Sequence, residues 1–367
     1  MRNFPIKPPG KSPAHPQGHM TGPTPASNPT FDSQPMKIAL DAMGGDFAPR
    51  NMLAGARMAL AAYPGISTLY LVGDASRLKS EMDSMGFSDS RAVIVHASEV
   101  VEMTDSAVKS LRQKKDSSIA VATDLVKRGD AQAVVSAGHT GAAVAAATVK
   151  LRTLAGVERA GILSPLPNLH GTCGLIDAGA NVDSKPLHLV QHAIMGHVFS
   201  KAINKTASPI VGLMSNGEEE GKGSELSKAA FELLKAVPFL NFKGNVEGRD
   251  VLNMHLHVAV CDGFVGNILL KGCEGTAKAF LSVLKEQLTA TAPRKVLAGL
   301  LKPAFKAAAA RMSYESYGGS PLLGVNGVVI IAHGSSSPLA MQNALRVATE
   351  MIQLSVNPMI EELIGSL

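Results

Sequence analysis

Short runs rich in Val, Ile and Leu alternate with longer segments of helical periodicity along most of this chain. Several runs are continuously apolar instead of alternating with polar residues, a pattern typical of strands that helices cover on both faces of a parallel sheet. The order of the segments predicts a doubly wound α/β/α sandwich around a mostly parallel sheet. The expected strands are residues 37–42, 68–74, 92–97, 133–138, 161–166, 172–179, 209–214, 258–263 and 328–333. The expected helices include residues 49–62, 118–128, 140–151, 186–203, 224–236 and 335–353.

The first 35 residues differ from the rest in composition. They hold nine of the 21 prolines and almost no periodic apolar pattern. We therefore expect residues 1–35 to be a disordered Pro-rich leader and residues 36–367 to form the folded α/β domain. Three cysteines without metal-ligand spacing and the lack of a secretory signal favour a cytoplasmic protein.

Polar, glycine-rich turns follow six of the expected strands. They are residues 41–46, 138–141, 177–185, 216–222, 262–267 and 333–336. Because the carboxyl ends of parallel strands meet at one edge of a sheet, we expect these turns to share one rim and form a ligand site there. Backbone N–H groups in such turns and at the following helix N-termini favour an anion.

One of these turns, SNGEEEGKGSEL (residues 215–226), resembles a phosphate-binding P-loop without fulfilling its pattern. Only three residues separate Gly217 from Gly221, and Gly223 stands where the pattern needs Ser or Thr. The loop nevertheless places Lys222 after an expected strand and before an expected helix. Lys222 is therefore either a solvated loop residue or a ligand for an anion at the rim.

The motifs at these turns resemble, in order, those of the phosphate acyltransferase family of bacterial phospholipid synthesis. The resemblance rests on ALDAMGGD, LRQKKDSSIA, SAGHTGA, GANVDSKPLHLVQHAIMG, EEGKGSEL, DGFVGNILLKGCEG, YGGSPLLGV and AHGSS, spread over residues 36–355. It implies a Rossmann-like fold related to isocitrate and isopropylmalate dehydrogenases and to phosphotransacetylases. It also implies a homodimer without metal or nucleotide cofactor. The implied reaction transfers a long acyl chain from acyl-carrier protein to inorganic phosphate, and the acyl phosphate then serves a glycerol-3-phosphate acyltransferase.

The resemblance points to Lys222 and Asn267 as active-site residues. An ammonium at Lys222 would bind phosphate or the developing oxyanion, and the amide of Asn267 would donate to the carbonyl oxygen. The predicted substrate-binding residues are Asp41, Gly44, Gly45, Asp46, Gly138, His139, Thr140, Gly141, Asn181, Lys185, Asn216, Asp262, Gly263, Gly266 and His333.

Among these residues, Asn181 and Lys185 form a weaker candidate pair for phosphate or the acyl donor. The carboxylates of Asp41, Asp46 and Asp262 are predicted acceptors that orient lysines and backbone amides. For His333 a structural role is favoured over a proton shuttle, and the same holds for His255 and His257.

Two positions depart from the family pattern. His139 stands where the family commonly has Asn, so it is either a phosphate donor or a local, pH-sensitive substitution. Cys261 stands where the family usually has a hydroxyl residue, which argues against a nucleophilic role for this thiol.

Residues 285–312 are predicted to form a basic amphipathic helical segment. Within residues 285–311, six basic residues face a single acid, Glu286, and apolar residues recur at helical spacing. The predicted membrane contacts are Leu297, Leu300, Leu301 and Phe305. Pro303 is expected to kink the segment or split it into two helices. Such a segment suits an anionic membrane surface, and the alternatives are packing on a dimer partner or docking of acidic acyl-carrier protein.

Other activities fit the sequence less well. A phosphotransacetylase acting on an acyl-coenzyme A is the main alternative, and a non-enzymatic scaffold for acyl-carrier protein is another. A dehydrogenase of the isopropylmalate class would need metal-binding aspartates and a dinucleotide motif, and no GxGxxG follows a strand. Nucleic acid is not an expected partner, because aromatic and basic residues do not interleave.

Overall fold

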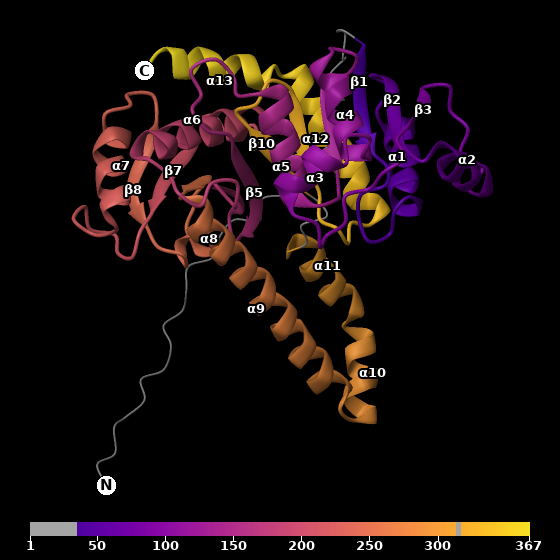
Figure 1. Ribbon diagram of the computed structural model, residues 1–367. Coiled ribbons are helices and arrows are strands. Elements are labelled where there is room, and N and C mark those ends of the chain that lie inside the picture. Colours follow the sequence, from indigo (N-terminus) through magenta and orange to yellow (C-terminus); the bar gives the residue numbers. More distant parts are fainter. Residues whose placement is uncertain (1–34, 313–316) are drawn as a thin grey trace, which may run out of the picture. The chain divides into compact units, whose positions relative to one another are not determined.

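The computed structural model describes residues 35–312 and 317–367, which belong to one compact unit, Gln34–Leu367. An eleven-stranded sheet with helices on both faces forms this unit (Figure 1). The strands are β1 (Met36–Asp41), β2 (Ile66–Gly73), β3 (Ala92–His96), β4 (Ala133–Ser136), β5 (Gly161–Asn168), β6 (Gly171–Ile176), β7 (Ile210–Met214), β8 (Asn241–Val246), β9 (Val258–Val260), β10 (Ser320–Leu323) and β11 (Val328–Ile331).

The helices cover the sheet in two layers. They are α1 (Arg50–Ala62), α2 (Ala75–Ser84), α3 (Ala107–Gln113), α4 (Ser118–Lys127), α5 (Thr140–Ala146) with the π-helical turn η1 (Ala147–Leu151), α6 (Pro186–Ala202), α7 (Glu225–Lys235), α8 (Asp250–Asn253), α9 (Gly263–Thr289), α10 (Ala292–Leu300), α11 (Lys302–Met312), α12 (Pro338–Gln353) and α13 (Val356–Gly365). One apolar core joins the sheet to α1, α6, α7, α12 and α13, and other clusters join it to α4, α5 and α8. The predicted α/β/α sandwich is therefore confirmed.

The sheet reverses its direction in the middle, which overturns the expectation of one shared rim. The strand order is β3-β2-β1-β4-β11-β10-β5-β6-β9-β7-β8. Strands β3, β2, β1, β4 and β11 are parallel to one another, and so are β6, β9, β7 and β8. Three antiparallel pairings, β11–β10, β10–β5 and β5–β6, lie between these groups. The two parallel groups consequently point in opposite directions, and the six polar turns divide between opposite ends of the sheet.

Every predicted strand is present, but two strands were missed. The strand β8 has the polar sequence NFKGNV at the sheet edge, and β10 is a four-residue strand that contains Pro321. Neither resembles a continuous apolar run. The predicted leader lies, apart from Pro35, outside the described residues, and β1 begins at Met36.

The predicted basic segment is not one helix. Its first residues belong to the 27-residue helix α9, and α10 and α11 follow as separate helices. The chain breaks at Leu301, between α10 and α11, and Pro303 falls in the first turn of α11, so the expected split is confirmed. Figure 1 shows α9 running away from the sheet, α10 at its far end and α11 returning. We call α9, α10 and α11 the helical arm.

Buried histidines in α6 make the stability of the fold depend on pH. His192 is fully buried, and burial is the main cause that lowers the pKa of its imidazole. Burial also lowers the pKa of His197. A depressed folded-state pKa means that the unfolded chain binds protons more readily, so stability is lost as the pH falls below the unfolded value of about 6.5.

We therefore expect the free energy of unfolding to fall between about pH 7 and about pH 5, and the His192→Leu variant to lose part of this dependence. Urea unfolding at a series of pH values measures the effect. The control is His96→Leu, because His96 is exposed on β3. Equal pH dependence in the wild type and the His192→Leu variant would contradict the assignment.

Candidate active site

The turns after β1, β4 and β11 meet at one end of the sheet. A Cβ on Gly44 would lie 2.7 Å from the Gly138 nitrogen, so the first two turns are in backbone contact. The Asp46 N–H donates to the Gly334 carbonyl at 2.8 Å, which joins the third turn. Gly45 has a φ of 106°, a conformation that favours glycine. These close approaches need residues without side chains.

Asp41 holds these turns from below. Its carboxylate is buried and accepts from the Ser136 hydroxyl at 2.7 Å and from the Met43 N–H at 3.3 Å. Burial raises the pKa of this carboxyl group, and the hydrogen bonds oppose the shift. Asp41 therefore acts on the backbone of its own turn.

The two histidines of this group bond to their own turns. His139 precedes α5, and its Nδ1 accepts from the Ala142 N–H at 3.2 Å, so the neutral ring carries its proton on Nε2. Thr140, beside it, is exposed, and Gly141 lies against the His139 ring. His333 Nδ1 lies 2.8 Å from the Ser335 hydroxyl and accepts from the Ser335 N–H. Both rings thus help to shape the start of a helix.

At the opposite end of the sheet, Asp177 organises the turn after β6. Its fully buried carboxylate accepts five hydrogen bonds between 2.7 and 3.1 Å. The donors are the N–H groups of Ile162, Gly179, Ala180 and Asn181 and the side-chain amide of Asn181. The sequence did not single out Asp177, because its partner Ile162 belongs to a different strand.

The first turn of α9 packs directly on this loop. The Asp262 carboxylate caps the helix by accepting from the Phe264 and Val265 N–H groups. A Cβ on Gly263 would lie 2.6 Å from the Asn181 carbonyl oxygen, and one on Gly266 would collide with the Asp177 carbonyl oxygen. The half-buried side chain of Asn267 then lies about 3.6 Å from the Cβ position of Gly179.

The loop between β7 and α7 lies beside the start of α9, and the two enclose a cavity of ≈ 500 Å³. We call it the β7–β9 cavity. Its lining residues are Leu189, Met214, Ser215, Asn216, Gly223, Ser224, Leu226, Ser227, Cys261, Asp262 and Val265. One side of this lining is apolar, and the other carries hydroxyl, amide and backbone groups. The predicted residue Asn216 is thereby part of the cavity.

Lys222 is exposed in this loop, and its side chain packs over Gly217. The residue after it, Gly223, lines the cavity, while Asp262 and Val265 lead into the helix that carries Asn267. The structure thus brings the two segments that carry Lys222 and Asn267 to one cavity.

The acidic residues beside Lys222 pair with other cations. The Glu220 carboxylate lies 3.2 Å from the Lys235 ammonium, and Glu218 lies 3.7 Å from the Arg249 guanidinium. These pairs reduce the negative charge that the loop would otherwise present to an anion.

Several features give the polar side of the cavity its character. The Ser215 hydroxyl is buried without a hydrogen-bond partner, and α7 begins at Ser224 with N–H groups that no helical carbonyl reaches. The Cys261 thiol donates to the Asp177 carbonyl at 3.6 Å, and burial raises its pKa well above the usual value. A thiol held protonated in this way is a poor nucleophile.

The other predicted pair lies near this cavity with part of its bonding capacity already used. The Asn181 amide donates to the Ala160 carbonyl at 2.6 Å and to Asp177 at 2.8 Å. Lys185 is exposed at the start of α6, where its N–H donates to His188 Nδ1 at 3.1 Å. The Lys185 ammonium is thus better placed than the Asn181 amide to meet a ligand.

Within residues 35–312 and 317–367, three acids bring possible metal-ligand atoms within 4.8 Å of one another. They are Glu218, Glu247 and Asp250. Arg249 forms ion pairs with all three, so a guanidinium already supplies the positive charge that a cation would bring.

Comparisons with known proteins agree with this architecture. A family model described as "Fatty acid synthesis protein" matches residues 36–359. A phosphate acyltransferase from Akkermansia muciniphila is 55% identical over 333 residues, which cover 89% of this chain and 95% of that protein. One from Pelotomaculum thermopropionicum is 47% identical over 334 residues, covering 90% and 95%.

Solved structures of phosphotransacetylases share the fold. The EutD phosphotransacetylase from Staphylococcus aureus has a TM-score of 0.56, and a phosphotransacetylase from Streptococcus pyogenes has one of 0.57. Each is 18% identical and covers 87% of this chain and 94% of its own.

The fold and these relatives define an α/β enzyme of the acyltransferase class. The chain belongs to the phosphate acyltransferase family, and it is a transferase of lipid synthesis that moves an acyl group to phosphate.

The contact between α9 and the Asp177 loop can be tested with two glycines of the same helix. We expect Gly266→Ala to lower the free energy of unfolding by about 2 kcal/mol or more, because its Cβ would meet the Asp177 carbonyl oxygen and the Cys261 sulfur. The matched control is Gly272→Ala, because open space surrounds that position. It should stabilise the helix by about 0.5–1 kcal/mol. Urea unfolding measures both variants, and equal effects would rule out the close contact.

Proposed function

We propose that this enzyme transfers a long-chain fatty acyl group from acyl-carrier protein to inorganic phosphate within the β7–β9 cavity. The observation that carries the proposal is the divided lining of this cavity. Leu189, Met214, Leu226 and Val265 offer an apolar wall for an acyl chain. Ser215, Asn216 and the N-terminus of α7 offer donors for an anion on the other side.

The reaction needs positioning more than covalent help from the protein. A phosphate oxygen attacks the thioester carbonyl carbon, a new C–O bond forms, and the C–S bond breaks with departure of the carrier thiolate. Phosphate is already a nucleophile near neutral pH. The enzyme therefore has to align the two reactants, stabilise the oxyanion and exclude water from the acyl phosphate product.

Lys222 and Asn267 are the proposed catalytic residues. The Lys222 loop is long and exposed, so its ammonium can turn toward a phosphate bound at the start of α7. Asn267 lies one turn into α9, above the Gly179 backbone, where its amide can donate to the thioester carbonyl oxygen. Lys185, at the start of α6, is a further cation for the phosphate of the acyl donor.

The turns after β1, β4 and β11 stay a separate prediction. They contain Asp41, Asp46 and His139 and lie at the opposite end of the sheet from Lys222. A substrate in the β7–β9 cavity of one chain would not touch them directly. Their predicted substrate-binding role thus requires a second part of the substrate or a second chain of the expected homodimer.

We further propose that the helical arm binds an anionic membrane surface and so delivers the acyl phosphate to a glycerol-3-phosphate acyltransferase. Leu300 is 74% exposed, and Leu297 and Leu301 are more than half exposed. Phe280 and Val283 extend the apolar surface along α9. The basic residues of the segment would meet lipid headgroups. None of the described helices is long and apolar enough to cross a bilayer.

The catalytic proposal is tested by incubating palmitoyl-acyl-carrier protein with phosphate and measuring free thiol and hydroxylamine-reactive acyl phosphate. We expect Lys222→Ala and Asn267→Ala each to lower turnover by at least about tenfold, since donors of this kind contribute roughly 10²–10³ in rate. Lys228→Ala is the control, because Lys228 is exposed on α7 and pairs with Glu225. Near-normal turnover in both active-site variants would refute their roles. A clear preference for palmitoyl-coenzyme A would favour the phosphotransacetylase-like alternative.

The membrane proposal is tested by flotation with liposomes that contain anionic lipid. We expect the double variant Leu300→Glu and Leu301→Glu to lose most of its binding, because each acid removes apolar area and adds repulsion. Leu354→Glu is the control, since Leu354 is exposed between α12 and α13. If the double variant floats as well as the control, the arm is not the membrane contact.

A further inference from the structure

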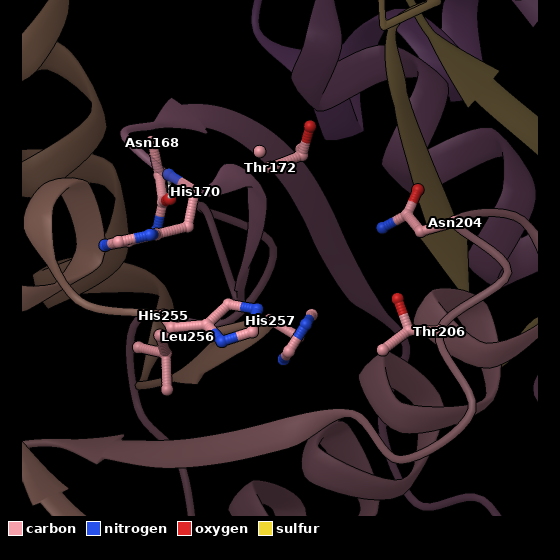
Figure 2. Close-up of a pocket in the computed structure, with 9 residues that line it drawn as sticks. Asn168, His170, Thr172, Asn204, Thr206, His255, Leu256 and His257 are labelled. Atoms are coloured by element: carbon pink, nitrogen blue, oxygen red, sulfur yellow. Dashed lines mark hydrogen bonds between the residues drawn. The ribbon is translucent and has the colours of Figure 1, made fainter. Parts of the chain in front are cut away.

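A second cavity of ≈ 320 Å³ lies at the other end of β6, β7 and β9, and three histidines line it (Figure 2). We call it the histidine pocket. Its lining residues are Asn168, His170, Gly171, Thr172, Asn204, Thr206, His255, Leu256 and His257. They come from the β5–β6 turn, the loop after α6 and the segment before β9. The proposed reaction uses none of these residues.

The ring contacts bring the three imidazoles into one group. The ring centroids of His170 and His255 are 5.5 Å apart, and those of His255 and His257 are 4.7 Å apart. Burial and the neighbouring His255 lower the pKa of His257. Rings that crowd in this way favour the neutral form until a negative charge enters.

The hydrogen bonds determine what two of the rings can offer. His257 Nδ1 accepts from the Ile210 N–H at 3.0 Å, so the neutral ring carries its proton on Nε2. His170 Nε2 lies 3.0 Å from the Asn253 carbonyl, to which it donates. His257 therefore has an N–H donor left for a ligand and no lone pair for a metal.

The spacing of the rings also disfavours a metal. In the described part of the chain, the only trio of possible ligand atoms within 4.8 Å of one another is that of Glu218, Glu247 and Asp250. The three histidines do not meet this limit, whereas zinc-bound nitrogens lie about 2.0–2.1 Å from a shared ion.

The remaining lining side chains complete a set of donors. Figure 2 shows Thr172, Asn204, Thr206 and His257 around a common space. Hydroxyl and amide groups can each donate a hydrogen bond, and no carboxylate belongs to the lining. A pocket that offers several donors and no negative charge is suited to an anion.

We propose that the histidine pocket binds the phosphate group of a small phosphate monoester. The phosphate would accept from His257 Nε2, Asn204 and the two threonines, and His255 would gain a proton beside it. At ≈ 320 Å³ the pocket is at the small end of ligand cavities, with room for an organic group beyond the phosphate.

Binding strengthens as the pH falls, because protonated imidazoles attract the dianion more strongly. The titrating groups are His170, His255 and His257. The charged residues on the elements around them are Lys201 at the end of α6, Lys205 in the following loop and Asp250 of α8. The Asp250 carboxylate accepts from the Glu247 N–H at 2.7 Å, and Arg249 pairs with it, so it does not cancel the effect.

This site is separate from the β7–β9 cavity. The strand β9 has three residues, with His257 just before it and Cys261 just after it. At a rise of about 3.3 Å per residue these two positions are roughly 13 Å apart. The proposal therefore holds whether or not the proposed transfer reaction is right.

The test follows the histidine Cε1 signals of the full-length protein by NMR, with carbon-13-labelled histidine and phenyl phosphate or inorganic phosphate as the probe. We expect phenyl phosphate to shift the signals of His255 and His257, with affinity about tenfold higher near pH 6 than near pH 7.5. Inorganic phosphate should bind this pocket more weakly, because it leaves the rest of the cavity empty.

The decisive variant is Asn204→Asp, which adds a negative charge to the pocket at an exposed loop position. Its affinity for phenyl phosphate should fall by about tenfold. Ser84→Asp adds the same charge on α2 and should leave the affinity unchanged. The proposal is overturned if neither probe shifts these signals, if both probes bind equally well, or if Asn204→Asp binds as tightly as the control. Zinc ions that shift all three histidine signals when the phosphates do not would replace it with a metal site.

Discussion

The buried carboxylate of Asp177 is the interaction on which this end of the molecule depends. A buried charge is costly unless hydrogen bonds compensate it, and five donors surround this one. The Ile162 N–H ties the loop to β5, and three successive backbone amides fix its path. The Asp177 carbonyl then supports Gly266, so the position of α9, and of Asn267 on it, follows from one satisfied carboxylate.

The reversal of strand direction gives the molecule two polar ends instead of one. The end formed by β1, β4 and β11 contains glycine turns in backbone contact, with Asp41 buried beneath them. The end formed by β6, β7 and β9 contains a cavity with an apolar and a polar wall. A thioester with a long acyl chain and a small anion makes different demands on its surroundings, and the second end meets both of them.

The sequence predicted the layers of the fold and most of its strands, since continuous apolar runs report burial directly. It did not predict strand direction, because an apolar run looks the same whichever way it points. Strand β10 carries the reversal and was itself missed, as a short strand with a proline. The family resemblance pointed to Lys222 and Asn267, whereas Asp177 and the histidine pocket depend on contacts between distant segments. His170 and His257, for instance, share a pocket although the chain between them includes α6, β7 and α7.

The place of β10 and β11 at the centre of the sheet has a consequence for how the chain matures. These strands come from the last fifth of the sequence, yet they join β4 to β5, and Ser164 meets Ser320 across 156 positions. During synthesis on the ribosome the two halves of the sheet can collapse separately, but the seam between them stays open until the final strands emerge. Such long-range pairing is slow, and it leaves apolar strand edges exposed in the meantime. A nascent chain of this enzyme is therefore most in need of a chaperone just before its translation ends.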